Sequence, residues 1–156
     1  RVGWVARPDK LVVAWVRSLA AAACGEQVAG LLVGRDATLH VAPMDPVDAR
    51  QTLVGLIDAW QEGLSRPLPV ALRTALAALD AAGKPWQVYE GTANASAERE
   101  DPCLYRLYPD YEALCADGEF DGWAETLYGP LCTWIDGHVQ CTMHPGAGSA
   151  EEGGAA

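Results

Sequence analysis

The chain has 156 residues, of which 50% are apolar, so it is long enough to fold as one domain around a hydrophobic core. Its net charge of −10 comes from residues 100–156, where eleven acids face Arg106 alone, because ten acids and ten basic residues balance in residues 1–99. This charge excludes a free-standing nucleic-acid binder, which needs a basic surplus, and no apolar run approaches the ~18 residues of a membrane span.

A helix and then a β-hairpin are predicted for residues 8–43. Apolar residues recur at helical spacing over residues 8–24, and Gly25 supplies a left-handed stop. The runs 27–33 and 37–43 flank a Gly-Arg-Asp turn and predict two strands. A two-stranded hairpin is not stable alone. It should therefore extend a sheet formed upstream of Arg1 or pack under the flanking helices, and we favour the first.

Helices fill most of the remaining chain. Asp45 suits the cap position and Pro46 the first position of a helix that runs to Gly63. A second helix is predicted over residues 70–82, with Gly83 as its stop. Further helical segments are predicted over residues 85–90, 103–108, 110–118 and 121–135, with a polar linker at 92–101 and strain at Gly129-Pro130 in the last helix.

The predicted fold class is therefore α+β and helix-rich, with a short hairpin and several helices. Residues 1–136 form one domain segment, and the small and polar residues of 137–156 are expected to be a disordered tail. Four possible zinc ligands fall around this boundary, but their spacing lacks the paired short knuckles of structural zinc sites, so we expect no metal. These four residues are Cys132, His138, Cys141 and His144.

No catalytic pattern is evident, and we expect neither enzyme activity nor a cofactor in this segment. Nucleases of the PD-(D/E)xK superfamily need an acid two residues before a lysine to hold metal and orient water. The two lysines here, Lys10 and Lys84, are preceded at that position by Pro8 and Ala82. The sequence also lacks a GxSxG nucleophile elbow and a glycine-rich phosphate loop. Pro8-Asp9 is therefore interpreted as a helix start.

Four basic residues are the candidates for nucleic-acid contact. Lys10 and Arg17 lie seven residues apart and so share a helix face, while Arg66 and Arg73 bracket the stretch with two prolines. A few arginines can contact phosphate, but the acidic balance favours solvated faces or contacts with neighbouring protein chains instead.

Several short motifs, taken in order, resemble the C-terminal domain of the exodeoxyribonuclease V gamma subunit, the RecC component of the RecBCD helicase–nuclease. The family shows a helix that ends in a QG(M/L)xxPLPL corner, then a (K/R)TA helix start, a YEG and a late PL. The matching residues here are Gln61–Val70, Arg73-Thr74-Ala75, Tyr89-Glu90-Gly91 and Pro130-Leu131, with Trp15, Leu19 and Gly25 on an upstream WxxHLxxxAxG-like helix.

The resemblance implies a PD-(D/E)xK nuclease-like fold that has lost its active site. Its role would be a scaffold that docks the helicase–nuclease (beta) and second-motor (alpha) subunits. It would also guide strands from double-stranded DNA ends during recombinational repair. The alternative is a small helical protein-interaction module stabilised by zinc.

We expect a cytoplasmic location, because no signal-peptide pattern follows Arg1 and the five scattered cysteines lack CxxC spacing. Since the chain does not begin with methionine, we also expect it to be a piece of a longer protein. Such a piece should expose apolar patches where partner chains would cover it, with Trp15, Trp60, Trp86 and Trp123 divided between core and interface.

Overall fold

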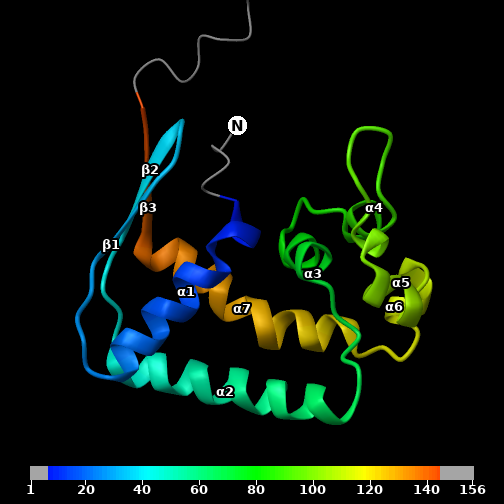
Figure 1. Ribbon diagram of the computed structural model, residues 1–156, viewed down its shortest axis with the longest axis horizontal. Helices are drawn as coiled ribbons and strands as arrows, with labels where there is room; N and C mark the ends of the chain where they lie inside the picture. Colours follow the sequence, from blue (N-terminus) through cyan, green and yellow to red (C-terminus); the bar gives the residue numbers. More distant parts are fainter. Residues whose placement is uncertain (1–6, 145–156) are drawn as a thin grey trace, which may run out of the picture. The chain divides into compact units, whose positions relative to one another are not determined.

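The computed structural model describes residues 7–144, which form seven α-helices, a 3-10 helix and a small antiparallel sheet, in agreement with the predicted α+β class (Figure 1). The contacts divide the chain into two compact units, residues 1–50 with 133–156 and residues 51–132, and we describe each by itself. In chain order the elements are α1 (Pro8–Ala23), β1 (Gly30–Val33), β2 (Ala37–Val41), α2 (Pro46–Ser65), α3 (Leu72–Leu79), α4 (Pro85–Glu90), η2 (Glu98–Glu100), α5 (Pro102–Leu107), α6 (Tyr111–Cys115), α7 (Phe120–His138) and β3 (Val139–Met143).

The first unit is built on α1 and the sheet. Pro8 starts α1, whose buried residues recur at intervals of three or four along one face, as the sequence predicts. Strand β2 lies in the centre of the sheet and buries every second residue. Arg50, at the start of α2, donates from Nε to the carbonyl of Ala23 at 2.8 Å and so ties α2 to the end of α1. The buried residues of α1 and β2 are Leu11, Trp15, Leu19, Ala22, Ala37, Leu39 and Val41.

The third strand of the sheet comes from the C-terminal side. Strand β3 pairs with β2 and occupies residues 139–143, which were expected to belong to a disordered tail, while the expected extension by strands upstream of Arg1 stays a prediction. The physical reason is that β2 has a second edge to satisfy. His144, directly after β3, also contacts the hairpin. Its Nε2 lies 2.7 Å from Thr38 Oγ1, and its Nδ1 lies 3.1 Å from the Arg35 carbonyl oxygen. Residues 145–156 of the predicted tail lie outside the described residues.

The second unit has its own core around Tyr89, which is fully buried on α4. The Tyr89 hydroxyl donates to the carbonyl of Tyr108 at 2.6 Å, and burial raises the pKa of Tyr89 to about 12. The Tyr89 ring lies 6.3 Å from the Tyr111 ring, and the Tyr111 ring meets the Phe120 ring edge-on at 5.9 Å. The remaining buried members of this cluster are Ala71, Ala75, Leu114 and Ala124.

Three glycines have roles that the sequence did not assign. Gly63 does not end α2, because the helix continues to Ser65 before Pro67 and Pro69 turn the chain. Similarly, α3 ends at Leu79, and Gly83 follows where an added Cβ would collide with a backbone carbonyl of α3. Gly91, at the end of α4, has φ +80°, and an added Cβ would lie 2.9 Å from the amide nitrogen of Ala97. Glycine is therefore required at positions 83 and 91.

Carboxylates hold the start of several helices. Asp45, Asp101 and Asp110 accept hydrogen bonds from backbone amides at the starts of α2, α5 and α6. A longer-range contact serves α3, whose own cap position is Ala71. The Glu98 carboxylate accepts from the amides of Arg73 and Thr74, at 2.8 and 2.7 Å, and from the buried Thr74 hydroxyl at 2.7 Å. Much of the acidic charge in this part of the chain is therefore structural.

We expect Glu98→Ala to lower the free energy of unfolding by about 1–3 kcal/mol, because it leaves two helix amides and a buried hydroxyl without an acceptor. Urea denaturation followed by circular dichroism measures the change. Glu100→Ala is the matched control, since Glu100 is exposed in the same 3-10 helix. Equal stability of the two variants would contradict this role for Glu98.

Candidate functional site

Arg66, at the proline corner, is enclosed by acids of its own unit. Its Nη2 lies 2.6 Å from Glu62 on α2 and 2.6 Å from Glu119, just before α7, and its guanidinium lies over the Trp123 ring at 5.8 Å. The hydrogen bond to Glu119 is the main reason that the pKa of Arg66 is raised, and the same bond lowers the pKa of Glu119. This arrangement neutralises Arg66 and closes the corner between α2 and α7.

The second arginine beside the corner, Arg73, is also engaged. Its Nε lies 3.8 Å from the Glu98 carboxylate, and Nη2 donates to the Ser96 carbonyl at 3.4 Å. Arg66 and Arg73 are both half-buried, so a phosphate would have to compete with carboxylates already in place. Their assignment to nucleic-acid contact stays a prediction.

The two basic candidates of α1 lie in the other unit and are more open. Lys10 is exposed and its ammonium lies 3.4 Å from Asp9, which also pairs with Arg7 at 3.1 Å. Arg17 is exposed, and no residue in 7–144 forms an ion pair with it. It stands instead at a groove of about 270 Å³ between α1 and β1, whose other lining residues include Ala14, Ala21, Val28 and Leu31.

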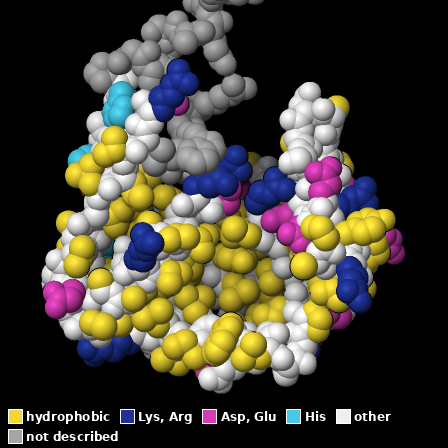
Figure 2. Space-filling view, in the orientation of Figure 1, with side chains coloured by type: hydrophobic (Ala, Val, Ile, Leu, Met, Phe, Trp, Pro, Cys, Tyr) yellow, Lys and Arg dark blue, Asp and Glu magenta, His cyan; other side chains and the backbone are white. Residues whose placement is uncertain are grey.

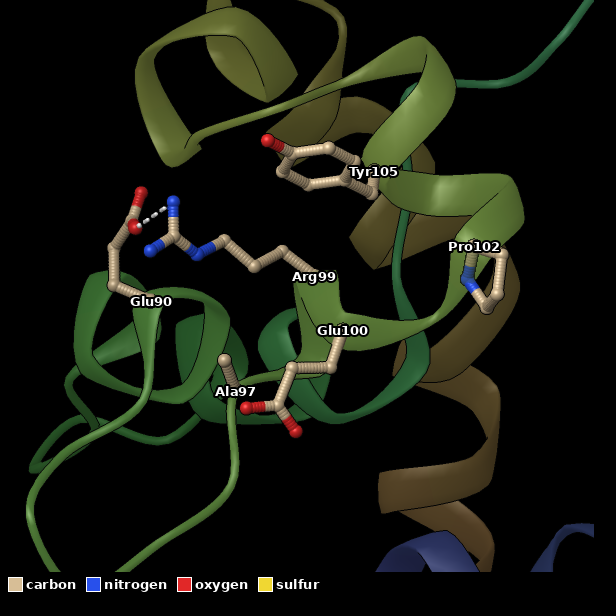
Figure 3. A pocket seen from close by; sticks show the side chains of 6 residues that line it. All are labelled: Glu90, Ala97, Arg99, Glu100, Pro102 and Tyr105. Carbon is tan, nitrogen blue, oxygen red and sulfur yellow. Dashed lines mark ion pairs between the residues drawn. The ribbon is translucent and has the colours of Figure 1, made fainter.

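A small open pocket lies among α4, η2 and α5 in the second unit (Figure 3). The Arg99 side chain extends through it toward Glu90, and Nη1 pairs with that carboxylate at 3.0 Å and donates to the Pro109 carbonyl at 3.2 Å. Because these charges are already matched, the geometry supports a structural ion pair rather than a binding centre. The pocket of about 480 Å³ is lined by Glu90, Ala97, Arg99, Glu100, Pro102 and Tyr105.

The outer face of α2 is an apolar stripe, which we define as Val54, Ile57, Trp60 and Leu64. These residues follow at intervals of three, three and four, so they share one side of the helix. Their exposed fractions are 57%, 49%, 63% and 69%. Figure 2 shows hydrophobic side chains gathered over α2. Of the four tryptophans that were expected to divide between core and interface, Trp15 is buried and Trp123 is half-buried, while Trp60 and Trp86 are exposed.

The candidate zinc ligands are not assembled into a site. In residues 7–144 no group of three or more His, Cys, Asp or Glu side chains is placed to hold a metal ion. His144 binds the hairpin as described above, and His138 Nδ1 lies 3.0 Å from the Pro43 carbonyl. The geometry therefore gives no support to zinc at these positions. None of the helices within residues 7–144 could span a membrane.

The comparisons with known proteins identify the class of chain that carries these surfaces. A family model described as the RecC C-terminal domain matches residues 2–83, which is more than half of the 156 residues and includes the proline corner. The chain belongs to the RecC C-terminal domain family, and it is thereby a segment of the gamma subunit of exodeoxyribonuclease V, the RecBCD complex. No curated protein and no solved structure matches the chain.

Sequence reasoning had missed the groove at Arg17 and the neutralisation of Arg66. The uncharged run of valines and leucines in residues 28–33 was a usable signal, because a solvated edge strand normally carries charge or proline. Glu119 offered no comparable signal, since it lies far along the chain from Arg66 and only the fold brings them together.

We expect the Arg66–Glu119 contact to stabilise the protein at neutral pH and to fail in acid. The folded pKa of Glu119 is below its ordinary value, so its contribution is present above the unfolded pKa, near 4.3, and is lost as pH falls through the lower folded pKa. The difference in urea midpoint between the wild type and Glu119→Gln should therefore be constant from pH 7 to about 5 and then shrink. Asp58→Asn, at an exposed position on α2, is the control for the loss of one negative charge.

Proposed function

We propose that this chain is a non-catalytic docking segment of the exodeoxyribonuclease V gamma subunit, with the apolar stripe on α2 as its contact with another subunit of the complex. The observation that carries the proposal is a row of four exposed apolar side chains on a helix of a RecC C-terminal domain. This function places the chain in the cytoplasm, in a helicase–nuclease that processes double-strand breaks for recombinational repair.

The energetics of the stripe support docking. A helix whose outer side always faces water carries polar residues there. The outer side of α2 carries apolar residues instead, namely Val54, Ile57, Trp60 and Leu64. Covering such side chains contributes roughly 1.5–3 kcal/mol for each that becomes fully buried, before the costs of association. Trp60 is the strongest single candidate, because tryptophans are over-represented among the residues that dominate interfaces.

The proposed fold relation is to PD-(D/E)xK nucleases, without their active site. The Asp9 carboxylate, the acid of the superficial Pro8-Asp9 motif, pairs with Arg7 and Lys10 at the start of α1. That arrangement suits a helix start and leaves this acid engaged by two cations. The segment would then act by holding other subunits in place.

Guidance of DNA strands is the second candidate function. It is favoured by the exposure of Lys10 and Arg17 on α1, because no carboxylate in residues 7–144 forms an ion pair with Arg17. Arg66 and Arg73 would contribute only after release from Glu62, Glu119 and Glu98. The charge of the chain as a whole makes docking the stronger proposal.

We expect Leu64→Glu to weaken capture of the helicase–nuclease or second-motor subunit by at least about tenfold, because it sets an unpaired charge in a covered apolar face. The measurement is a pull-down with each purified subunit. Gln51→Glu is the matched control, with the same added charge at an exposed position of α2 outside the stripe. The docking proposal fails if the folded chain captures neither subunit, or if both variants bind like the wild type.

The pure chain should also leave linear duplex DNA intact in the presence of ATP and magnesium. Gel electrophoresis of end-labelled DNA measures this, and an active RecBCD preparation serves as the positive control. Degradation that co-purifies with the chain through successive columns would contradict a non-catalytic role.

A further inference from the structure

Strand β1 has one edge that no other strand of the described residues covers. The sheet order is β1-β2-β3, so β1 pairs on one side only. Gly34 donates to the Ala37 carbonyl at 2.8 Å, and the register pairs Leu32 with Leu39 and Gly30 with Val41. Because antiparallel bonding alternates, the even-numbered residues of β1 turn their backbone groups to β2. Leu31 and Val33 therefore turn theirs to the open edge.

Apart from its length of four residues, this edge lacks the features that normally protect an exposed strand. It reads Gly-Leu-Leu-Val, without lysine, proline or a bulge, and the side chains of Leu31 and Val33 are 62% and 73% exposed. An unpaired amide and carbonyl on alternate residues, beside apolar side chains, are what a strand added to the edge would use.

The groove between α1 and β1 indicates which side chains the added strand should have. Its walls include Ala14, Ala21 and Val28, which suit an apolar side chain, and the exposed Arg17 guanidinium stands at its lining without a carboxylate. A cation left without a partner beside an apolar groove is complementary to a segment that combines alternating apolar residues with an acid.

We propose that the open edge of β1 receives an extended polypeptide segment. The segment adds to the sheet as a strand, places an apolar side chain in the α1–β1 groove and pairs a carboxylate with Arg17. This proposal deepens the proposed function, because it adds a second docking surface of defined chemistry. It rests on the proposed function only because it requires a polypeptide partner.

The test uses the folded chain and a synthetic seven-residue peptide, acetylated and amidated, in which valine alternates with threonine after an aspartate at one end. Amide hydrogen exchange by NMR should slow at least about tenfold for Leu31 and Val33 when the peptide is added. Leu32, whose amide already faces β2, is the internal control and should not change. An absence of selective protection at Leu31 and Val33 overturns the proposal.

Two variants extend the test. Leu31→Pro removes the amide that faces the open edge but removes no hydrogen bond to β2, so it should weaken peptide binding at least about tenfold. Leu31→Thr is the control, because it keeps that amide and should bind the peptide more tightly than Leu31→Pro does. Arg17→Gln should weaken the aspartate peptide about threefold and leave a peptide with asparagine at that position unchanged.

Two other outcomes would also overturn the proposal. A dimer of the chain in sedimentation velocity that Leu31→Pro disperses would assign the edge to a second copy. Displacement of the peptide from Arg17 by a short DNA duplex, without effect of Leu31→Pro on peptide binding, would assign the groove to nucleic acid. If the peptide binds at β1 but the pull-down captures neither subunit, the docking role of α2 fails and the docking role of β1 stands.

Discussion

The Glu98 carboxylate is the contact on which the second unit most depends. It replaces the missing cap of α3, satisfies the buried Thr74 hydroxyl and lies beside Arg73, all from a 3-10 helix that follows α4 in the chain. Helix α3 has only eight residues, too few to be stable without tertiary support. Holding its first amides fixes it against α4, whose Tyr89 is the centre of the core.

The same use of carboxylates changes how the charge of the chain is understood. The net charge of −10 suggests an acidic surface. However, Asp45, Asp101 and Asp110 already accept hydrogen bonds from backbone amides at the starts of helices. Several basic residues are likewise matched: Arg66 is held by two acids and Arg99 by one. The main features left for a partner are therefore apolar, the stripe on α2 and the open edge of β1, beside which Arg17 stands without an ion pair in residues 7–144.

Local signals made most of the fold predictable from sequence. Asp-Pro pairs and periodic apolar residues placed α1, α2 and α5 within a few residues, and the turn after Val33 placed the hairpin. Contacts between distant residues could not be seen this way. Strand β3 was missed because the segment 139–143 is short and mostly exposed, and gains its order from pairing with β2. Of the four basic candidates, the sequence could not show that Arg66 and Arg73 are half-buried in ion pairs.

We propose that another subunit covers the stripe on α2. Hydroxyl-radical footprinting of the chain, alone and with the helicase–nuclease and second-motor subunits, tests it most directly. Trp60 and Trp86 are 63% and 53% exposed, so both should be oxidised in the free chain. We expect assembly to protect Trp60 and to leave the oxidation of Trp86 unchanged. Equal oxidation of Trp60 before and after assembly would contradict it.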